Sequence, residues 1–320
     1  MLVAHISDTH IRNLKYHWEY RQSFADLYNK LRDQKPDAIV HTGDIAHTKT
    51  QLSPEYFELT SEFLGSLADI APLYIILGNH DGNLKNADRQ DAITPIVEAL
   101  QNPNIHLLKN SGEVQMPNNI VFNVLSVFDR ENWVQPTDLS KINIALYHGS
   151  ISGCETGQGF KIRDGDDTSE IFKDFDYAFL GDIHKPQVMD REGRVRYAGS
   201  TCQQNYGEDP RKGYLLWNIQ SKDEFSVRHE VLVNPRPFLT INLTEDGELP
   251  ETHIPPNARL RVVSRYNIPL TKLRQAVDAA EVKWRPFSVT FVNKGAGSNS
   301  QNQGMLADGR FENLRDIQVQ

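Results

Sequence analysis

Cysteine is scarce in this sequence: its 320 residues include two, Cys154 and Cys202. Two cysteines cannot build a disulfide framework, and neither has the neighbours of a zinc knuckle or a redox motif, so a reducing compartment such as the cytoplasm is expected. The chain also lacks an apolar run near the ~20 residues that a membrane helix requires, and no basic leader precedes a long apolar stretch at its start. We therefore expect no membrane segment and no secretory signal.

An excess of positive charge is absent as well. The 34 lysines and arginines are outnumbered by 42 aspartates and glutamates, which gives a net charge of −8 with histidine neutral. This balance argues against a protein that holds nucleic acid mainly through a large basic surface, although a locally positive or metal-loaded groove would escape the whole-chain sum. Composition leaves the function open, and the length predicts one large domain with a smaller module.

Short apolar runs alternate with helix-like stretches in the first part of the chain. The runs are mostly aliphatic, β-branched or aromatic, which is typical of buried strands in a layered α/β sheet. In open sheets of this kind the loops at the carboxyl ends of the strands converge, so residues far apart in sequence can line one crevice. The expected strands are 2–6, 38–40, 73–77, 142–147 and 177–180, and helices are expected at about 18–32, 54–67 and 92–100.

Side chains of the metal-ligand type follow each of these five strands. In two places an aspartate and a histidine stand two residues apart at a strand end, where the period of two points both to the same side. The set contains carboxylates, an amide and imidazoles but no thiolate, which suits manganese, iron or zinc. It exceeds one coordination shell, so two divalent ions are expected. The candidate ligands are Asp8, His10, Asp44, Asn79, His148, Asp182 and His184.

Each element alone has an ordinary structural explanation. An isolated Asp-x-His is usually surface or capping chemistry, and Gly-Asp or Gly-Asn is usually a turn. Five such elements in chain order, each directly after a predicted strand, favour a metal site instead, because the structural context that the motifs require is present as well.

A second module is expected after the proline-containing stretch Asn234-Pro235-Arg236-Pro237, which places a boundary near 235. Strand-like 238–243, 259–264 and 286–292, with an amphipathic 270–280, describe a small α/β unit. The predicted organisation is therefore a large domain over 1–234, a small domain over 235–293, and a polar linker and tail over 294–320.

The motif series resembles that of the calcineurin-like metallophosphoesterase superfamily. The matching elements are Asp8-Thr9-His10, Gly43-Asp44, Gly78-Asn79-His80-Asp81, His148-Gly149 and Gly181-Asp182-Ile183-His184. Residues 197–208, continuing into 212–217, resemble more closely the nuclease subunit of SbcCD-type DNA repair complexes. The resemblance covers about residues 1–235 well. It implies a four-layer α/β/β/α sandwich with a small C-terminal α/β cap domain that helps to angle DNA into the site.

The resemblance also implies how the ligands divide between two ions, which are expected to be Mn²⁺. One ion takes Asp8, His10 and His184, the other takes Asn79 and His148, and Asp44 bridges them. The family has a histidine where this chain has Asp182. That aspartate either ligates the second ion or hydrogen-bonds a neighbouring ligand; ligation is favoured because the position and side-chain direction are retained.

Three residues are expected to act on the substrate. His80 follows Asn79 directly and is expected to face the phosphate, with Asp81 orienting and charging its ring so that it stabilises the transition state or protonates the leaving group. His47 stands where the family has a histidine that faces substrate, but a structural hydrogen bond at the strand end is an equal alternative.

The activity implied by the resemblance is two-metal hydrolysis of phosphodiester bonds in DNA. It comprises double-strand exonuclease and single-strand endonuclease activity in DNA end processing, recombination and repair. The implied partners are DNA, an SbcC-type SMC-like ATPase docked through the C-terminal tail, and a second copy of the chain, with 59–67 and 92–100 as candidate dimer helices. The implied location is cytoplasmic, with the nucleoid or in a host cytoplasm.

Alternatives remain open at this point. One is a small-nucleotide phosphodiesterase or phosphatase of the same superfamily, and another is a metal-free scaffold that kept the fold, for which Asp182 is the hint. Basic residues of the small domain either contact phosphates or form a solvated face. These residues are Arg259, Arg261, Arg265, Lys272, Arg274, Lys283 and Arg285.

Overall fold

The computed structural model describes residues 1–86 and 88–294. The chain divides into two compact units, the first comprising Met1–Leu239 with Asn257–Arg259, and the second comprising Thr240–Pro256 and the chain from Leu260 onward. The division falls a few residues beyond the predicted position at 234/235. The linker and tail predicted over 294–320 lie outside the described residues, apart from Lys294.

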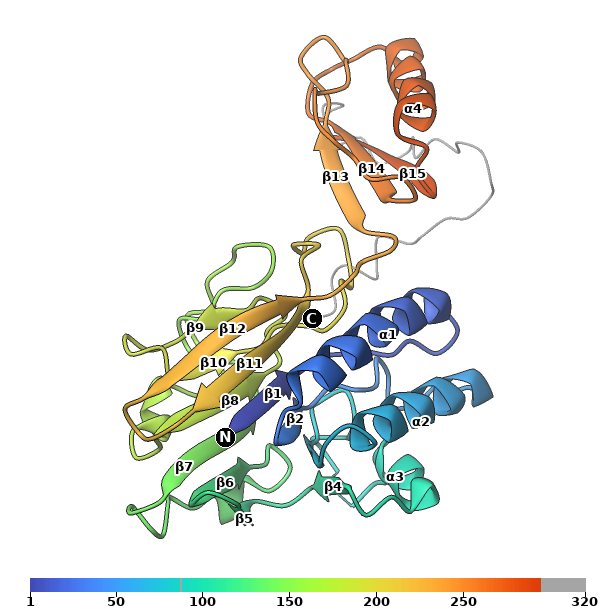
Figure 1. Ribbon diagram of the computed structural model, residues 1–320. Helices are drawn as coiled ribbons and strands as arrows, with labels where there is room; N and C mark the ends of the chain where they lie inside the picture. The colour runs from blue at the N-terminus through green and yellow to red at the C-terminus, as the bar shows by residue number, and fades with distance from the viewer. Residues whose placement is uncertain (87, 295–320) are drawn as a thin grey trace. The chain divides into compact units, whose positions relative to one another are not determined.

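Two six-stranded sheets make up the first unit (Figure 1). In the first sheet the strand order is β12-β11-β1-β2-β3-β4; strands β1 to β4 run parallel, and the hairpin β11–β12 joins antiparallel to β1. Its strands are β1 (Leu2–Ile6), β2 (Ala38–Thr42), β3 (Leu73–Ile76), β4 (Ile105–Leu108), β11 (Gly213–Ile219) and β12 (Phe225–Val231).

The second sheet has the order β5-β6-β7-β8-β10-β9, with β6, β7, β8 and β10 parallel and with β5 and β9 antiparallel at its edges. Its strands are β5 (Gly112–Met116), β6 (Ile120–Leu125), β7 (Ile142–His148), β8 (Tyr177–Gly181), β9 (Gln187–Val188) and β10 (Val195–Tyr197). Burial on both faces explains the continuous apolar sequences of its central strands.

The core between the sheets is built from side chains that point inward from both, and it includes Val3 and Trp217 of the first sheet and Phe122 and Phe179 of the second. On the outer face of the first sheet lie three helices, α1 (His17–Gln34), α2 (Pro54–Ala68) and α3 (Thr94–Leu100). The start of α2 follows from its sequence: the Ser53 side chain accepts a hydrogen bond from the Tyr56 amide, and proline occupies the first helical position.

The outer face of the second sheet is covered differently. Tyr147, Cys154 and Phe172 belong to the hydrophobic cluster on this face. In the described part of the chain, loops and two short 3-10 helices, η1 (Arg130–Asn132) and η2 (Ser169–Phe172), provide this layer. The expected α/β sandwich of two sheets is confirmed, and its fourth layer is irregular.

The helices suggested for dimerisation direct their apolar side chains into the protein core. Leu59, Phe63 and Leu67 of α2 and Ile96 of α3 belong to the cluster beneath the first sheet, and each is at most 2% exposed. These side chains are therefore not available to a second copy of the chain.

The second unit contains a three-stranded sheet in the order β13-β14-β15, with strands β13 (Phe238–Asn242), β14 (Arg259–Ser264) and β15 (Ser288–Asn293), and the helix α4 (Leu270–Trp284). Leu260, Val262, Leu273 and Ala280 are buried in it. These elements correspond to the predicted small α/β domain. Within the described residues of both units, none of the helices combines the length and apolar character needed to cross a membrane.

Candidate two-metal site

The predicted ligands lie at the carboxyl ends of strands from both sheets. Asp8 and His10 follow β1, Asp44 follows β2 and Asn79 follows β3. From the second sheet, His148 is the last residue of β7, and Asp182 and His184 follow β8. Because these strands are parallel within each sheet, their ends share one edge, as the sequence pattern predicted.

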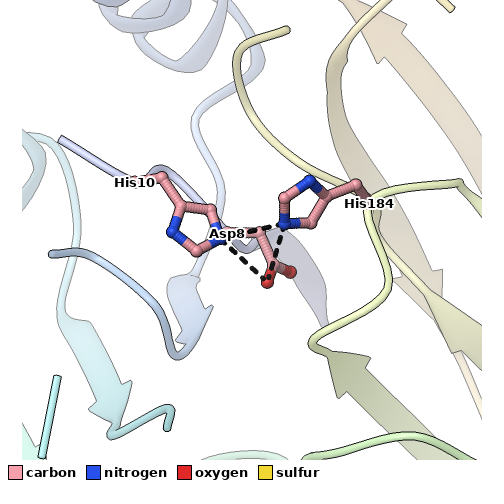
Figure 2. A group of neighbouring side chains, drawn as sticks. All are labelled: Asp8, His10 and His184. Atoms are coloured by element: carbon pink, nitrogen blue, oxygen red, sulfur yellow. Dashed lines mark hydrogen bonds and ion pairs between the residues drawn. The ribbon is translucent and has the colours of Figure 1, made fainter. Parts of the chain in front are cut away.

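One group of ligands consists of Asp8, His10 and His184 (Figure 2). The Nε2 atoms of His10 and His184 are 2.9 Å apart, and the Asp8 Oδ1 atom lies 3.9 Å from the first and 4.0 Å from the second. Figure 2 shows the two rings turning these nitrogens toward each other and toward the carboxylate. Three ligand atoms therefore face one small space.

A second group surrounds His148. Its Nε2 atom lies 3.2 Å from the Asn79 Oδ1 atom and 3.4 Å from the Asp44 Oδ1 atom. The other carboxylate oxygen of Asp44, Oδ2, lies 3.5 Å from the His10 Nε2 atom. Asp44 thus presents one oxygen to each group, which is the arrangement of a carboxylate that bridges two cations.

The two groups fit divalent cations. Metal–ligand bonds of about 2.0–2.2 Å to nitrogen and oxygen place the ligands of one ion roughly 3 to 4 Å from each other, as observed here. Asp8, Asp44 and His148 are at most 2% exposed. Two carboxylates buried this close repel each other unless positive charge lies between them, and a pair of divalent cations supplies it.

The Nδ1 atoms of two ligand histidines are held from behind. His148 donates its Nδ1 proton to the Thr42 carbonyl at 2.7 Å, and His184 donates its Nδ1 proton to the Glu208 Oε1 atom at 2.9 Å. Both hydrogen bonds leave the lone pair of Nε2 directed at the other ligands.

Sequence reasoning did not assign Glu208, although it lies in the segment 197–208 whose resemblance to nuclease subunits had been noted. Its carboxylate also accepts hydrogen bonds from the Gln204 amide at 3.0 Å and from the Asn205 side chain at 2.9 Å, and it pairs with Lys212 at 3.0 Å. Burial opposes its ionisation, but Lys212 and His184 lower the pKa of Glu208 to about 2. The carboxylate is therefore charged and held on every side.

The local backbone is strained around the ligands. Asp8, His10 and Asp44 have φ values of 48°, 47° and 57°, in the left-handed region that residues other than glycine enter rarely. Close packing adds a second constraint, because a Cβ atom on Gly78 would overlap the Asp44 carboxylate. This explains the glycine before Asn79 and the tight turn that brings Asn79 to the site.

His80 reaches the site, with its ring centroid 4.9 Å from that of His10, and its backbone amide donates to the Asp44 Oδ1 atom at 2.8 Å. Its Nδ1 proton goes to the His47 carbonyl at 2.8 Å. We predicted that Asp81 orients the His80 ring, but in the structure the two side chains have different partners. The turn aims the Asp81 carboxylate at the backbone amides of Asp44, Ala46 and Gly78, at 2.8, 2.8 and 2.9 Å, so Asp81 supports the loops instead.

His47 also lies beside the site. Its ring centroid is 5.7 Å from that of His10 and 6.1 Å from that of His80. Burial, and after it the positive charge of Arg12, lowers the pKa of His47 to about 3. The ring is therefore neutral at physiological pH in the metal-free protein.

Asp182 lies on the side of the second group, with its Oδ1 atom 3.8 Å from the His148 Nε2 atom. Its backbone has a φ of 93°, and its amide donates to both oxygens of Asp8 at 3.1 and 3.2 Å. Burial raises the pKa of Asp182 to about 6. The structure thus brings together all seven predicted ligands, with Asp182 at the margin; the metal ligation of Asp182 stays a prediction.

Electrostatic coupling within the site is strong. Burial opposes the ionisation of Asp44 and the protonation of His148, yet each stabilises the charge of the other, so the pKa of Asp44 is lowered and that of His148 is raised. For Asp8, burial outweighs the attraction of His148 and His184, so its pKa is raised. In the metal-free site, the negative charge of Asp44 and the positive charge of His148 therefore stabilise each other.

Comparison with known proteins agrees with this arrangement. Residues 1–194 match the profile of the family described as "Calcineurin-like phosphoesterase". "Uncharacterized protein R555" of Acanthamoeba polyphaga mimivirus is 38% identical over 276 residues, which cover 82% of this chain and 20% of that protein. "DNA double-strand break repair protein Mre11" of Methanococcus maripaludis is 26% identical over 265 residues, which cover 75% of this chain and 68% of that protein.

A shorter match is to "Glycerophosphodiester phosphodiesterase GpdQ" of Enterobacter lignolyticus, 37% identical over 87 residues, which cover 25% of this chain and 30% of that protein. The chain thus spans about a fifth of the mimivirus relative and about two thirds of the Methanococcus one. The family profile covers more than half of the chain, including every strand end that carries a predicted ligand. The chain belongs to the calcineurin-like phosphoesterase family.

Proposed function

We propose that this protein is a metal-dependent DNA nuclease that hydrolyses phosphodiester bonds with two Mn²⁺ ions. The observation that carries the two-metal reaction is the position of Asp44, whose two oxygens face separate ligand groups at 3.5 and 3.4 Å. DNA is favoured as the substrate by the likeness to Mre11 proteins, which extends over three quarters of the chain.

Divalent ions at such a site bind a phosphate oxygen and activate water at neutral pH. The protein's own groups hold the substrate in line. With Nδ1 of His80 bonded to the His47 carbonyl, Nε2 is the nitrogen left to meet the substrate. When Nε2 carries a proton, it donates a hydrogen bond to a phosphate oxygen or gives that proton to the leaving oxygen.

The remaining parts of the proposal concern assembly and location. The second unit carries basic residues on β14 and α4, including Arg261, Lys272 and Arg274, which suit contacts to DNA phosphates. An SbcC-type SMC-like ATPase and a second copy of the chain are the proposed protein partners in DNA end processing, recombination and repair. The proposed location is the cytoplasm, with the DNA. The tail proposed to dock the ATPase lies outside the described residues.

A single experiment tests substrate and metal together. Purified protein is incubated with end-labelled duplex and hairpin DNA in Mn²⁺, Mg²⁺ or EDTA, and in parallel with bis(p-nitrophenyl) phosphate and with cyclic and mononucleotides. We expect Mn²⁺-dependent cleavage of DNA that His80→Ala lowers by about a hundredfold. Cleavage of cyclic nucleotides but not of DNA by the wild-type protein would contradict the proposal.

The small-molecule phosphodiesterase is the second candidate, and the likeness to GpdQ over 87 residues favours it. That likeness covers 25% of the chain and leaves the rest without an explanation. The alternative of a metal-free scaffold predicts protein that binds no Mn²⁺ in calorimetry. It also predicts that His80→Ala has the wild-type rate on every substrate.

A further inference from the structure

Arg12 lies next to the two-metal site without a carboxylate partner. It is two residues beyond His10, in a segment that pairs with the chain leading to His47: the His10 amide donates to the Asp44 carbonyl at 3.0 Å and the His47 amide to the Ile11 carbonyl at 3.1 Å. This pairing carries Arg12 alongside His47, and the charge of Arg12 contributes to the lowered pKa of that ring. Arg12 therefore flanks the edge of the site at which His47 and His80 lie.

The guanidinium of Arg12 is short of acceptors. Its Nη2 atom has one long hydrogen bond, 3.5 Å to the Gln204 carbonyl, and its carbon lies 5.6 Å from the centre of the Tyr16 ring. The Nε atom is buried and has no hydrogen-bond partner, and no carboxylate among the described residues lies within ion-pair distance of Arg12. A guanidinium offers five donors, so within the described residues most donors of Arg12 have no protein acceptor.

Two other partly buried arginines of this unit have carboxylate partners. Arg194 pairs with Asp223 at 2.9 Å, and Arg236 pairs with Glu19 at 3.2 Å. A partly buried charge without a counter-ion is unfavourable unless a ligand supplies one, and a phosphate matches the planar fork of a guanidinium. The tyrosine contact explains how the side chain is held but not what neutralises it.

We propose that Arg12 forms a phosphate subsite that binds a phosphate of the DNA strand next to the one being hydrolysed. The inference rests on the proposed nuclease function and adds a specificity determinant to it. A substrate with a single phosphodiester has no group to place in the subsite, whereas a polynucleotide always has one. The subsite therefore selects polynucleotides over small phosphodiesters.

The test compares Arg12→Gln, Arg12→Lys and wild type on a single-stranded oligonucleotide and on bis(p-nitrophenyl) phosphate. A charge-assisted hydrogen bond of about 1.5–3 kcal/mol corresponds to a roughly 10- to 150-fold effect. We expect Arg12→Gln to lower kcat/KM on the oligonucleotide by at least ten times more than on the small substrate. Arg12→Lys should recover part of the difference, and the salt dependence of KM should lose about one unit of slope.

Arg32→Gln is a matched control. Arg32 also lies over a tyrosine ring, 6.0 Å from the centre of Tyr28, but it is in the last turn of α1, on the order of 20 Å from the start of that helix. The Arg32→Gln substitution should leave the activities on both substrates unchanged. Melting curves of the Arg12 variants and their residual activity on the small substrate report whether the site is still folded.

A chemical cycle locates the phosphate. The oligonucleotide is made with a neutral methylphosphonate at one linkage at a time on either side of the cleavage site. At the linkage bound by Arg12, the methylphosphonate should lower the activity of wild type. It should lower the activity of Arg12→Gln little further, so the effects of the two changes are not additive. Additive losses at every linkage, or equal losses on both substrates, would overturn the subsite.

Failure of the nuclease proposal gives a different result. If wild type cleaves no DNA, binding of a fluorescent oligonucleotide in EDTA is measured by anisotropy. Tenfold weaker binding by Arg12→Gln than by wild type would then support the phosphate subsite although the nuclease proposal has failed. Equal binding by the two proteins would overturn the subsite as well.

Discussion

The carboxylate of Glu208 accepts a hydrogen bond from Nδ1 of His184 at 2.9 Å, and this contact decides which nitrogen of the ring faces Asp8 and His10. The Lys212 ammonium group pairs with the same carboxylate and also donates to the His184 carbonyl at 2.7 Å. Both the ring and the backbone of one predicted ligand are thus fixed from the segment that follows the motifs.

Removing the Glu208 carboxylate should therefore weaken metal binding. We expect Glu208→Ala to lower the affinity for Mn²⁺ by about 10- to 100-fold, because the His184 ring loses its orientation and the buried Lys212 loses its partner. Glu208→Gln keeps a hydrogen-bond acceptor for Nδ1 of His184 but not the negative charge. Its affinity for Mn²⁺ should lie between those of wild type and Glu208→Ala. Titration calorimetry measures the affinity, with the exposed Glu192→Gln as control. An affinity equal to wild type in Glu208→Ala would show that the contact is incidental.

Replacing Asp182 tests the departure from the family motif. A histidine or an asparagine there removes one negative charge beside the second ligand group, which should make metal-bound water more acidic. We expect the acid limb of the pH–rate profile to move to lower pH by on the order of one unit in both Asp182→His and Asp182→Asn. Profiles that coincide with wild type would place Asp182 outside the reach of the metals.

Asp81 is expected to matter for stability first. Its carboxylate accepts from three buried amides, and an asparagine would turn an N–H group toward at least one of them. We predict that Asp81→Asn lowers the free energy of unfolding by about 2–4 kcal/mol in urea with EDTA present. The exposed Asp88→Asn serves as control. Unchanged stability with a large fall in kcat would instead favour the orientation of His80 by Asp81.

The buried His5 should make the protein sensitive to acid. Burial, and after it the neighbouring His41, lowers the pKa of His5 to about 3. An unfolded histidine titrates near pH 6.5, so between about pH 6.5 and 3 the unfolded state binds a proton that the folded state does not. Stability is therefore complete above this window and falls as the pH decreases through it, by up to about 1.4 kcal/mol per unit.

His5→Gln removes this contribution and should flatten the dependence by that amount. Urea unfolding between pH 4 and 8 with EDTA measures it, and His106→Gln is the control. Parallel slopes in His5→Gln and wild type would contradict the prediction.

The positions of the predicted ligands followed from the sequence because strand ends dictate them. The first strand was predicted with the bounds that the structure has, Leu2–Ile6, and the parallel order of β1, β2 and β3 carries the residues after them to one edge. A pattern of apolar runs and the residues that follow them is enough to predict this.

Other features depend on contacts that no local pattern contains. The half-exposed strand β5 has little apolar character of its own and is defined by its pairing with β6. Asp81 adjoins His80 in sequence, but the turn sends the two side chains to different partners. Glu208 meets His184 only because the chain returns through β9 and β10, so its role was visible in the fold and not in the motif.

The ligand groups draw on both sheets, and this has a consequence for assembly. Neither sheet holds a complete set, so the metal centre forms only after the sheets have docked, and bound metal then clamps them together. The aromatic contacts across the interface, His5 on Phe179 at 4.8 Å and Phe179 on Trp217 at 4.6 Å, set the spacing of the two halves. A substitution that loosens the packing between the two sheets should therefore lower the affinity for metal, even when it lies far from any ligand.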